Sequence, residues 1–308
     1  MSRPDTGQFV TAALSTGTAV PAFNIPYLPM VEPTVRALRD CDCVGLVVVA
    51  HLEFHKFEAR SLQAVRDAYR EHADDRHTRL HLDHMPVIDE DGADVDYRGG
   101  IEEALALGYE SVMVDASRLG FEANIAATRG IVEMAHSRDV PVEAELGAVA
   151  GHEAGELPPY EELFASKRGF TDPGEARAFV ERTGVDWLSV SVGSIHGAIS
   201  RARKDERKPG ARLDIPRLRA IAETTSVPLV LHGGTGIPSE IVRDGIANGI
   251  AKINIATATR QPYERALPSG ENAAREAVYQ AACRVITEDL KLAGSAPRLH
   301  AALNGGMS

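Results

Sequence analysis

Three histidines, His84, His196 and His232, each stand at the carboxyl end of a short apolar run that is typical of a buried strand. In a parallel barrel the carboxyl ends of all strands meet at one rim, which would bring the three imidazoles together. Three neutral imidazoles that leave one position open are the usual ligands of catalytic zinc. The pattern therefore predicts a catalytic metal site, although any one of these histidines alone would more often be structural.

Carboxylates accompany these histidines. Asp83 directly precedes His84, and neighbouring strand residues point to opposite faces. Asp83 therefore either supports a ligand from behind or, at an irregular strand end, reaches the cavity as an acid or base. His81 shares the face of Asp83, and it is either a partner of a carboxylate or ligand or an ordinary core histidine. Glu143 and Glu145 share a face two residues apart, and two carboxylates inside a barrel are costly unless they are paired or near a cation.

A glycine-rich turn follows the seventh apolar run. Gly233, Gly234 and Thr235 precede a helix that is predicted to begin at Pro238. Such a turn exposes backbone N–H groups that bind an anion, and phosphate sites after strands seven and eight recur in barrels. An ordinary tight turn is the alternative. We interpret the turn, together with the loop 254–257, as the binding site of a phosphorylated small molecule.

Eight strands must position these side chains, and the chain alternates eight times between a short apolar run and a segment with helical periodicity. The clearest helix has Asp172 as its N-cap, Pro173 at its first position and Gly184 after its end. Alternation of this kind implies parallel strands with right-handed crossovers, and eight repeats favour closure. We predict a single (β/α)₈ TIM barrel over residues 1–308 with a C-terminal helical extension to residue 292. The predicted strands are 19–25, 44–50, 78–83, 111–115, 141–146, 187–192, 228–232 and 251–255.

Composition limits the partners and the compartment. The formal net charge of −11 disfavours nucleic-acid binding, because a phosphate backbone would be repelled. No apolar run reaches the roughly 20 residues that span a membrane, and no signal peptide is visible at the N-terminus. The three cysteines do not form a disulfide-like framework. We therefore expect a cytoplasmic protein that binds neither membrane nor nucleic acid.

Taken in order, the motifs resemble those of the class II fructose-bisphosphate and tagatose-bisphosphate aldolases over residues 21–257. This resemblance implies a zinc-dependent aldolase that reversibly cleaves a ketose bisphosphate, similar to fructose 1,6-bisphosphate, into dihydroxyacetone phosphate and an aldehyde. The motifs that carry it are Ala22-Phe23-Asn24-Ile25, His81-Leu82-Asp83-His84, Ser111-Val112-Met113-Val114-Asp115, Val142-Glu143-Ala144-Glu145-Leu146-Gly147, His196-Gly197, Leu231-His232-Gly233-Gly234 and Lys252-Ile253-Asn254-Ile255.

The resemblance also implies individual roles. Asp83 matches the carboxylate that exchanges a proton with the C4 hydroxyl of the substrate, and Asn254 matches the asparagine that steadies the enediolate. Glu153 matches a loop glutamate that moves the proton at the dihydroxyacetone phosphate carbon. The implied metal ligands are His84, His196, His232 and the nearby Glu145, with a second divalent or a monovalent cation left open. The implied substrate-binding residues are Asn24, Gly197, Gly233, Gly234, Thr235, Asn254 and Thr257.

Two departures from the family pattern concern the substrate. The segment 51–56 carries Glu53 and Phe54 where family members have a loop of small residues near the aldehyde end. The usual phosphate lysine after Gly197 is missing, and a basic loop follows, so Arg201 or Arg203 is a hypothetical replacement. We therefore expect altered aldehyde specificity, with tagatose 1,6-bisphosphate or another ketose 1-phosphate as alternative substrates.

Three alternatives compete with this function. A zinc hydrolase on the same barrel would use His-x-His on the first strand, where this chain offers only Asn24. A Schiff-base aldolase would use Lys252, which the zinc mechanism does not require. A catalytically silent accessory barrel would not need to retain Asp83 and Asn254 beside the histidines. Members of the resembled family are dimers or larger, so a homodimer or homotetramer is expected, with the segment 264–292 available to pack against a partner.

Overall fold

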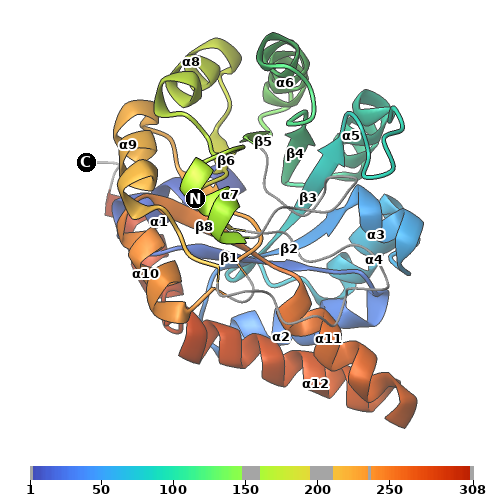
Figure 1. Cartoon of the computed structure of the whole chain (residues 1–308). Coiled ribbons are helices and arrows are strands. Elements are labelled where there is room, and N and C mark those ends of the chain that lie inside the picture. The colour runs from blue at the N-terminus through green and yellow to red at the C-terminus, as the bar shows by residue number, and fades with distance from the viewer. Residues whose placement is uncertain (1–2, 148–159, 195–210, 235–236, 306–308) are drawn as a thin grey trace.

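A computed structural model describes residues 3–147, 160–194, 211–234 and 237–305 of the chain. Eight parallel strands close into a barrel in the order β1 to β8, and helices surround it (Figure 1). This arrangement confirms the predicted (β/α)₈ fold. The strands are β1 Val20–Asn24, β2 Gly45–Ala50, β3 Thr78–Pro86, β4 Ser111–Asp115, β5 Val142–Leu146, β6 Trp187–Val190, β7 Leu229–Leu231 and β8 Ile250–Ile255.

The strands form where the sequence offers short apolar runs that can be buried on both faces. Every residue of β2 is buried, which is the pattern of a strand inside a helix-covered parallel sheet. The largest difference from the predicted strand bounds is in β3, which continues three residues beyond Asp83 to Pro86. The pairing of β3 with β4 shifts register between Leu82 and Met85, and His84 adopts a φ of +30°. This bulge lets the strand continue through a kink that a regular pleat does not allow.

The helices occupy the crossovers between strands and one additional position before β1. The unpredicted helix α1 packs Phe9 and Val10 under the barrel, against Val20, Val44 and Val230. The helices are α1 Thr6–Ser15, α2 Val31–Asp40, α3 His51–Lys56, α4 Leu62–His72, α5 Tyr97–Leu107, α6 Phe121–His136, α7 Tyr160–Ser166, α8 Pro173–Thr183, α9 Ile215–Thr225, α10 Ser239–Ala247, α11 Thr257–Ala266, α12 Glu271–Arg284 and α13 Ala296–Gly305. Helix α8 begins and ends as predicted, with the Asp172 carboxylate accepting from two backbone N–H groups and Gly184 left-handed at the end.

The C-terminal extension is several helices rather than one long helix. Helix α12 lies against α11 and α2 (Figure 1). Two ion pairs reinforce the contact with α2, at 3.0 Å between Arg275 and Glu32 and at 2.9 Å between Arg36 and Glu276. Much of the segment 264–292, which was predicted to be available to a partner, therefore packs against other helices of the same chain. Among the described helices, none is both long and apolar enough to cross a membrane.

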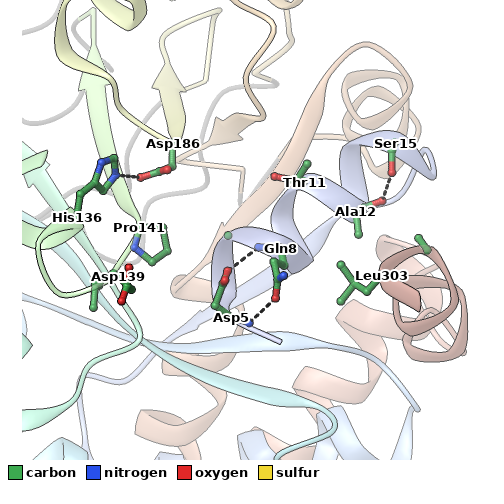
Figure 2. Close-up of a pocket in the computed structure, with 13 residues that line it drawn as sticks. Asp5, Gln8, Thr11, Ala12, Ser15, His136, Asp139, Pro141, Asp186 and Leu303 are labelled. Atoms are coloured by element: carbon green, nitrogen blue, oxygen red, sulfur yellow. Dashed lines mark hydrogen bonds and ion pairs between the residues drawn. The ribbon is translucent and has the colours of Figure 1, made fainter. Parts of the chain in front are cut away.

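A cavity of about 700 Å³ opens at the amino ends of the strands (Figure 2). It is lined by α1, α13 and the segments before β5 and β6. Two of its three carboxylates are already engaged in local structure: Asp5 accepts from the backbone N–H of Gln8 at 2.8 Å, and Asp186 contacts His136 at 2.8 Å and the backbone N–H of Val142 at 2.7 Å. The chemistry-bearing groups lie at the opposite end of the barrel.

Candidate active site

The carboxyl ends of β3, β5, β7 and β8 bring one polar cluster together. Three of its members are almost completely enclosed, with exposed fractions of 2% for Asp83, 0% for His232 and 3% for Glu145, whereas His84 and Asn254 are partly exposed. Asp83 and His84 both reach this cluster, although the alternation of a regular strand would separate them. The bulge in β3 at His84 resolves that conflict, because it turns two successive side chains toward the same side.

His84 and His232 face each other with their ring nitrogens 2.5 Å apart, Nε2 of His84 to Nδ1 of His232. The second nitrogen of each ring lies against a carboxylate, at 3.0 Å between His84 Nδ1 and Asp115 and at 2.8 Å between His232 Nε2 and Glu143. A carboxylate behind an imidazole fixes the N–H on that side and leaves the unprotonated nitrogen pointing forward. Two such nitrogens directed at one point repel each other unless a proton or a metal ion is held between them. The donor set therefore fits a divalent metal ion of the zinc type.

The surrounding charges also favour a cation. Burial disfavours a charged imidazolium, but Asp83 and the hydrogen bond to Asp115 outweigh burial and raise the pKa of His84 to about 10. Burial and the neighbouring His84 lower the pKa of His232. Burial and the nearby Asp115 raise the pKa of Glu145 to about 8. The cluster thus holds an excess of acidic groups, and a bound positive charge relieves their repulsion.

Lys252 on β8 links the carboxylates beneath this cluster. Its ammonium lies 2.7 Å from Glu143 Oε2 and 3.4 Å from Asp83 Oδ1. Burial would raise the pKa of Asp83, but Lys252 and His84 outweigh burial and hold it well below its usual value. Asn254 donates from Nδ2 to the second oxygen of Asp83 at 2.8 Å. Asp83 is therefore an ionised carboxylate in a fixed orientation, and Lys252 is a paired ammonium rather than a free nucleophile.

We expect Lys252→Met to destabilise the fold. Removing one partner of a buried ion pair leaves uncompensated charge and costs about 3–5 kcal/mol. Urea unfolding of chelator-treated protein measures this loss without a contribution from metal binding. Lys56→Met is the control, because Lys56 pairs with Glu90 at 2.6 Å on the surface, where an ion pair contributes about 0–1 kcal/mol. Equal stability of Lys252→Met and the wild type would contradict the interpretation.

The structure brings together most of the predicted site residues that it describes. Asp83, His84, Glu145, His232 and Asn254 belong to the cluster, with Glu145 3.9 Å from His232 Nδ1. Asn24 lies at the end of β1, where it contacts Glu53, and Thr257 begins α11. Gly233 has a φ of +67° in the turn after β7, as a glycine-rich turn requires. Four predicted residues lie outside the described part of the chain: Glu153, His196, Gly197 and Thr235.

A cavity of about 170 Å³ lies beside the predicted phosphate turn, with Gly234 and Asn254 in its wall. The amino end of α10 contributes Ser239 to the same wall, so N–H groups of the first helical turn lie near the cavity. The hypothesis that Arg201 or Arg203 binds phosphate concerns residues outside the described ranges.

Three functional contacts were missed by sequence reasoning. Asp115 supports His84, and its position at the carboxyl end of β4 was a signal that could have identified it. Glu143 supports His232, although the sequence showed only that it shares a face with Glu145. Glu53 is buried with 4% of its surface exposed, and burial raises its pKa to about 7. Its segment, at the place where family members have a loop of small residues, forms helix α3.

A comparison with known protein families tests the resemblance that the motifs suggested. The family model for class II fructose-bisphosphate aldolases matches residues 5–297, which is nearly the whole chain. This chain belongs to that family. Membership implies lyase activity, and the metal dependence typical of class II aldolases agrees with the groups of histidine and carboxylate ligand atoms at the rim.

Solved structures of aldolases share the fold. The YdjI aldolase from Escherichia coli K12 superimposes with a TM-score of 0.75 at 26% identity, over 95% of this chain and 98% of that one. A fructose-bisphosphate aldolase from Campylobacter jejuni superimposes with a TM-score of 0.70 at 18% identity, over 94% and 95% of the two chains. At such identity the second comparison concerns the fold alone.

Proposed function

We propose that this class II aldolase is zinc-dependent and reversibly cleaves a ketose bisphosphate similar to fructose 1,6-bisphosphate into dihydroxyacetone phosphate and an aldehyde. The facing ring nitrogens of His84 and His232, each backed by a carboxylate and set beside an ionised Asp83, carry this proposal. Tagatose 1,6-bisphosphate and other ketose 1-phosphates are the alternative substrates.

His84 and His232 would hold the zinc ion, with His196 as the third ligand and Glu145 close enough to exchange with one of them. When bound, the ion supplies Lewis-acid polarisation of the substrate's ketone. The proposal also includes a second divalent cation or a monovalent cation, bound near the substrate phosphate. The turn at Gly233 and Gly234, with Thr235, Gly197 and Thr257, would hold that phosphate through backbone N–H and hydroxyl groups.

The proton transfers fall to this chain's own residues. In cleavage, Asp83 would accept the proton of the C4 hydroxyl while the C3–C4 bond breaks, and its ionised state suits it to that role. Asn254, held against Asp83 at 2.8 Å, would hydrogen-bond to the oxygen that gains negative charge. Glu153 would then protonate the dihydroxyacetone phosphate carbon. Condensation runs through the same transfers in reverse.

One experiment tests the metal, the reaction and the substrate together. We expect purified protein to contain about one tightly held zinc per chain, and we expect a chelator to abolish aldol cleavage until zinc is added back. The assay compares fructose 1,6-bisphosphate, tagatose 1,6-bisphosphate and ketose 1-monophosphates. Cleavage that persists after complete removal of metal would refute the proposal, and a strong, exclusive preference for fructose 1,6-bisphosphate would refute altered aldehyde specificity.

The same assay separates the competing functions. Hydrolysis without carbon–carbon cleavage would favour a zinc hydrolase, and neither activity in metal-loaded protein would favour a silent accessory barrel. We also infer that the chain acts as a homodimer or homotetramer in the cytoplasm, on a phosphorylated small molecule. Light scattering of the purified protein measures the oligomeric state directly.

A further inference from the structure

Trp187 is the single tryptophan of the chain, and it lies inside the barrel with 1% of its surface exposed. It begins β6 and pairs with Glu143 in the ladder between β5 and β6. Its side chain belongs to the apolar cluster beneath the site, which includes Phe9 of α1 and Val230 of β7. Trp187 therefore stands where the apolar base of the barrel meets the polar cluster above it.

The indole N–H of Trp187 leaves the apolar cluster and reaches a carboxylate. It donates to Glu143 Oε2 at 2.6 Å, and the ammonium of Lys252 donates to the same oxygen at 2.7 Å. The other oxygen, Oε1, faces Nε2 of His232 at 2.8 Å. Because an ionised carboxylate only accepts hydrogen bonds, two donors on Oε2 fix the plane of the group and leave Oε1 for the imidazole.

This contact determines how His232 is presented to a metal ion. The carboxylate of Glu143 has no hydrogen to give, so Nε2 of His232 carries the N–H and Nδ1 keeps its lone pair. Nδ1 is the nitrogen that faces Nε2 of His84. A rotation of Glu143 would therefore turn the ring or change its tautomer, and either change displaces a metal ligand.

Lys252 alone leaves the direction of this carboxylate open. Its ammonium also lies 3.4 Å from Asp83 Oδ1, and a point charge on a flexible stem can be shared between two carboxylates. The indole N–H is instead a single donor on a rigid ring with two rotatable bonds, and the surrounding side chains bury that ring. Lys252 therefore supplies charge to Glu143, whereas Trp187 supplies direction.

We infer that Trp187 is a positioning residue of the proposed zinc centre, because its indole N–H holds one oxygen of Glu143 and thereby directs the other at His232. The inference rests on the proposed function and extends it to a residue that touches neither metal nor substrate. A side chain that only fills the apolar core needs the volume of its ring. The N–H group is needed only for positioning, so it separates the two roles.

The test replaces Trp187 by its benzothiophene analogue, in which sulfur stands in place of the indole N–H. The analogue keeps the shape and the apolar surface of the ring and removes the donor. We expect zinc affinity, measured by competition with a chromophoric chelator, to fall about tenfold, the lower end of the range for a lost supporting partner, because Lys252 still holds Glu143. Fluorotryptophan at the same position keeps the N–H and should retain wild-type affinity.

Trp187→Phe and Phe9→Leu are a matched pair of encoded variants. Both remove apolar volume from the same cluster, so both should unfold at lower urea concentration than the wild type. Only Trp187→Phe should weaken zinc binding. Glu143→Gln should weaken it by about 10–100-fold, and adding Trp187→Phe to that variant should cause no further loss, because Trp187 acts through Glu143.

The fluorotryptophan protein also gives a spectroscopic signal from one residue. Its single fluorine resonance should shift on addition of zinc, with the midpoint found by chelator competition, and should not shift in His232→Ala. A resonance that does not respond to zinc, wild-type zinc affinity in the benzothiophene variant, or an equal loss of affinity in Phe9→Leu would each overturn the inference. Zinc binding with these responses but without aldol cleavage would overturn the proposed function and support the inference, whereas a wild type that binds no zinc would overturn both.

Discussion

Replacing His232 with alanine is expected to abolish stoichiometric zinc binding and, with it, aldol cleavage. His232 supplies one of the two facing nitrogens at 2.5 Å, so the variant loses a metal ligand outright. Loss of a group that merely supports a ligand weakens metal binding about 10–100-fold, so loss of the ligand itself should exceed that range. The metal supplies several kcal/mol of transition-state stabilisation, so kcat/KM should fall by about 10³-fold or more. Competition with a chromophoric chelator and the cleavage assay measure the two effects.

Asp115→Asn is compared with His232→Ala, because it should weaken zinc binding without removing a ligand. Asp115 contacts Nδ1 of His84 at 3.0 Å and does not itself face His232 Nδ1. The amide oxygen of asparagine can still accept from the ring N–H, but the negative charge is lost, so zinc affinity should fall within the 10–100-fold range. Circular dichroism and thermal unfolding of both variants report whether the barrel remains folded. Wild-type zinc affinity in His232→Ala would exclude the proposed metal centre.

The fold was largely predictable because periodicity and burial act locally. Continuous apolar runs such as β2 are informative in a parallel sheet, where both faces are covered, and α8 carried its own start and stop signals in Asp172 and Gly184. The errors fell where the signal is not local. Helix α1 precedes the barrel and packs beneath it, and β3 continues past Asp83 through a bulge that no residue type announces.

The site was predictable only as a set of candidates. Parallel closure guarantees that strand ends meet, so His84, His232 and Asn254 could be grouped without knowing any distance. Which carboxylate supports which imidazole depends on how far each side chain reaches, and this assigns Asp115 on β4 to His84 on the neighbouring β3, and Glu143 on β5 to His232 two strands away. Sequence spacing contains no measure of that reach.

Glu53 also shows what the sequence alone leaves undetermined. The sequence identified Glu53 as a departure from the family pattern, but it did not show which residues Glu53 contacts. Only the helix that begins directly after β2 turns the carboxylate back onto Ala50 and Asn24.

Asp83→Asn is expected to separate the two proton transfers of the reaction. The variant keeps the shape of the side chain but removes the ionised group that would accept the C4 hydroxyl proton, so kcat for cleavage should fall by about 10²–10⁴-fold. Zinc content should not change, because the ring nitrogens of His84 and His232 still face each other. The metal-loaded variant should also still exchange the carbon-bound proton of dihydroxyacetone phosphate with solvent deuterium, since that transfer belongs to a different group, for which Glu153 is proposed. Cleavage at the wild-type rate would remove Asp83 from the mechanism, and loss of exchange together with cleavage would show that Asp83 supports the site as a whole rather than one proton.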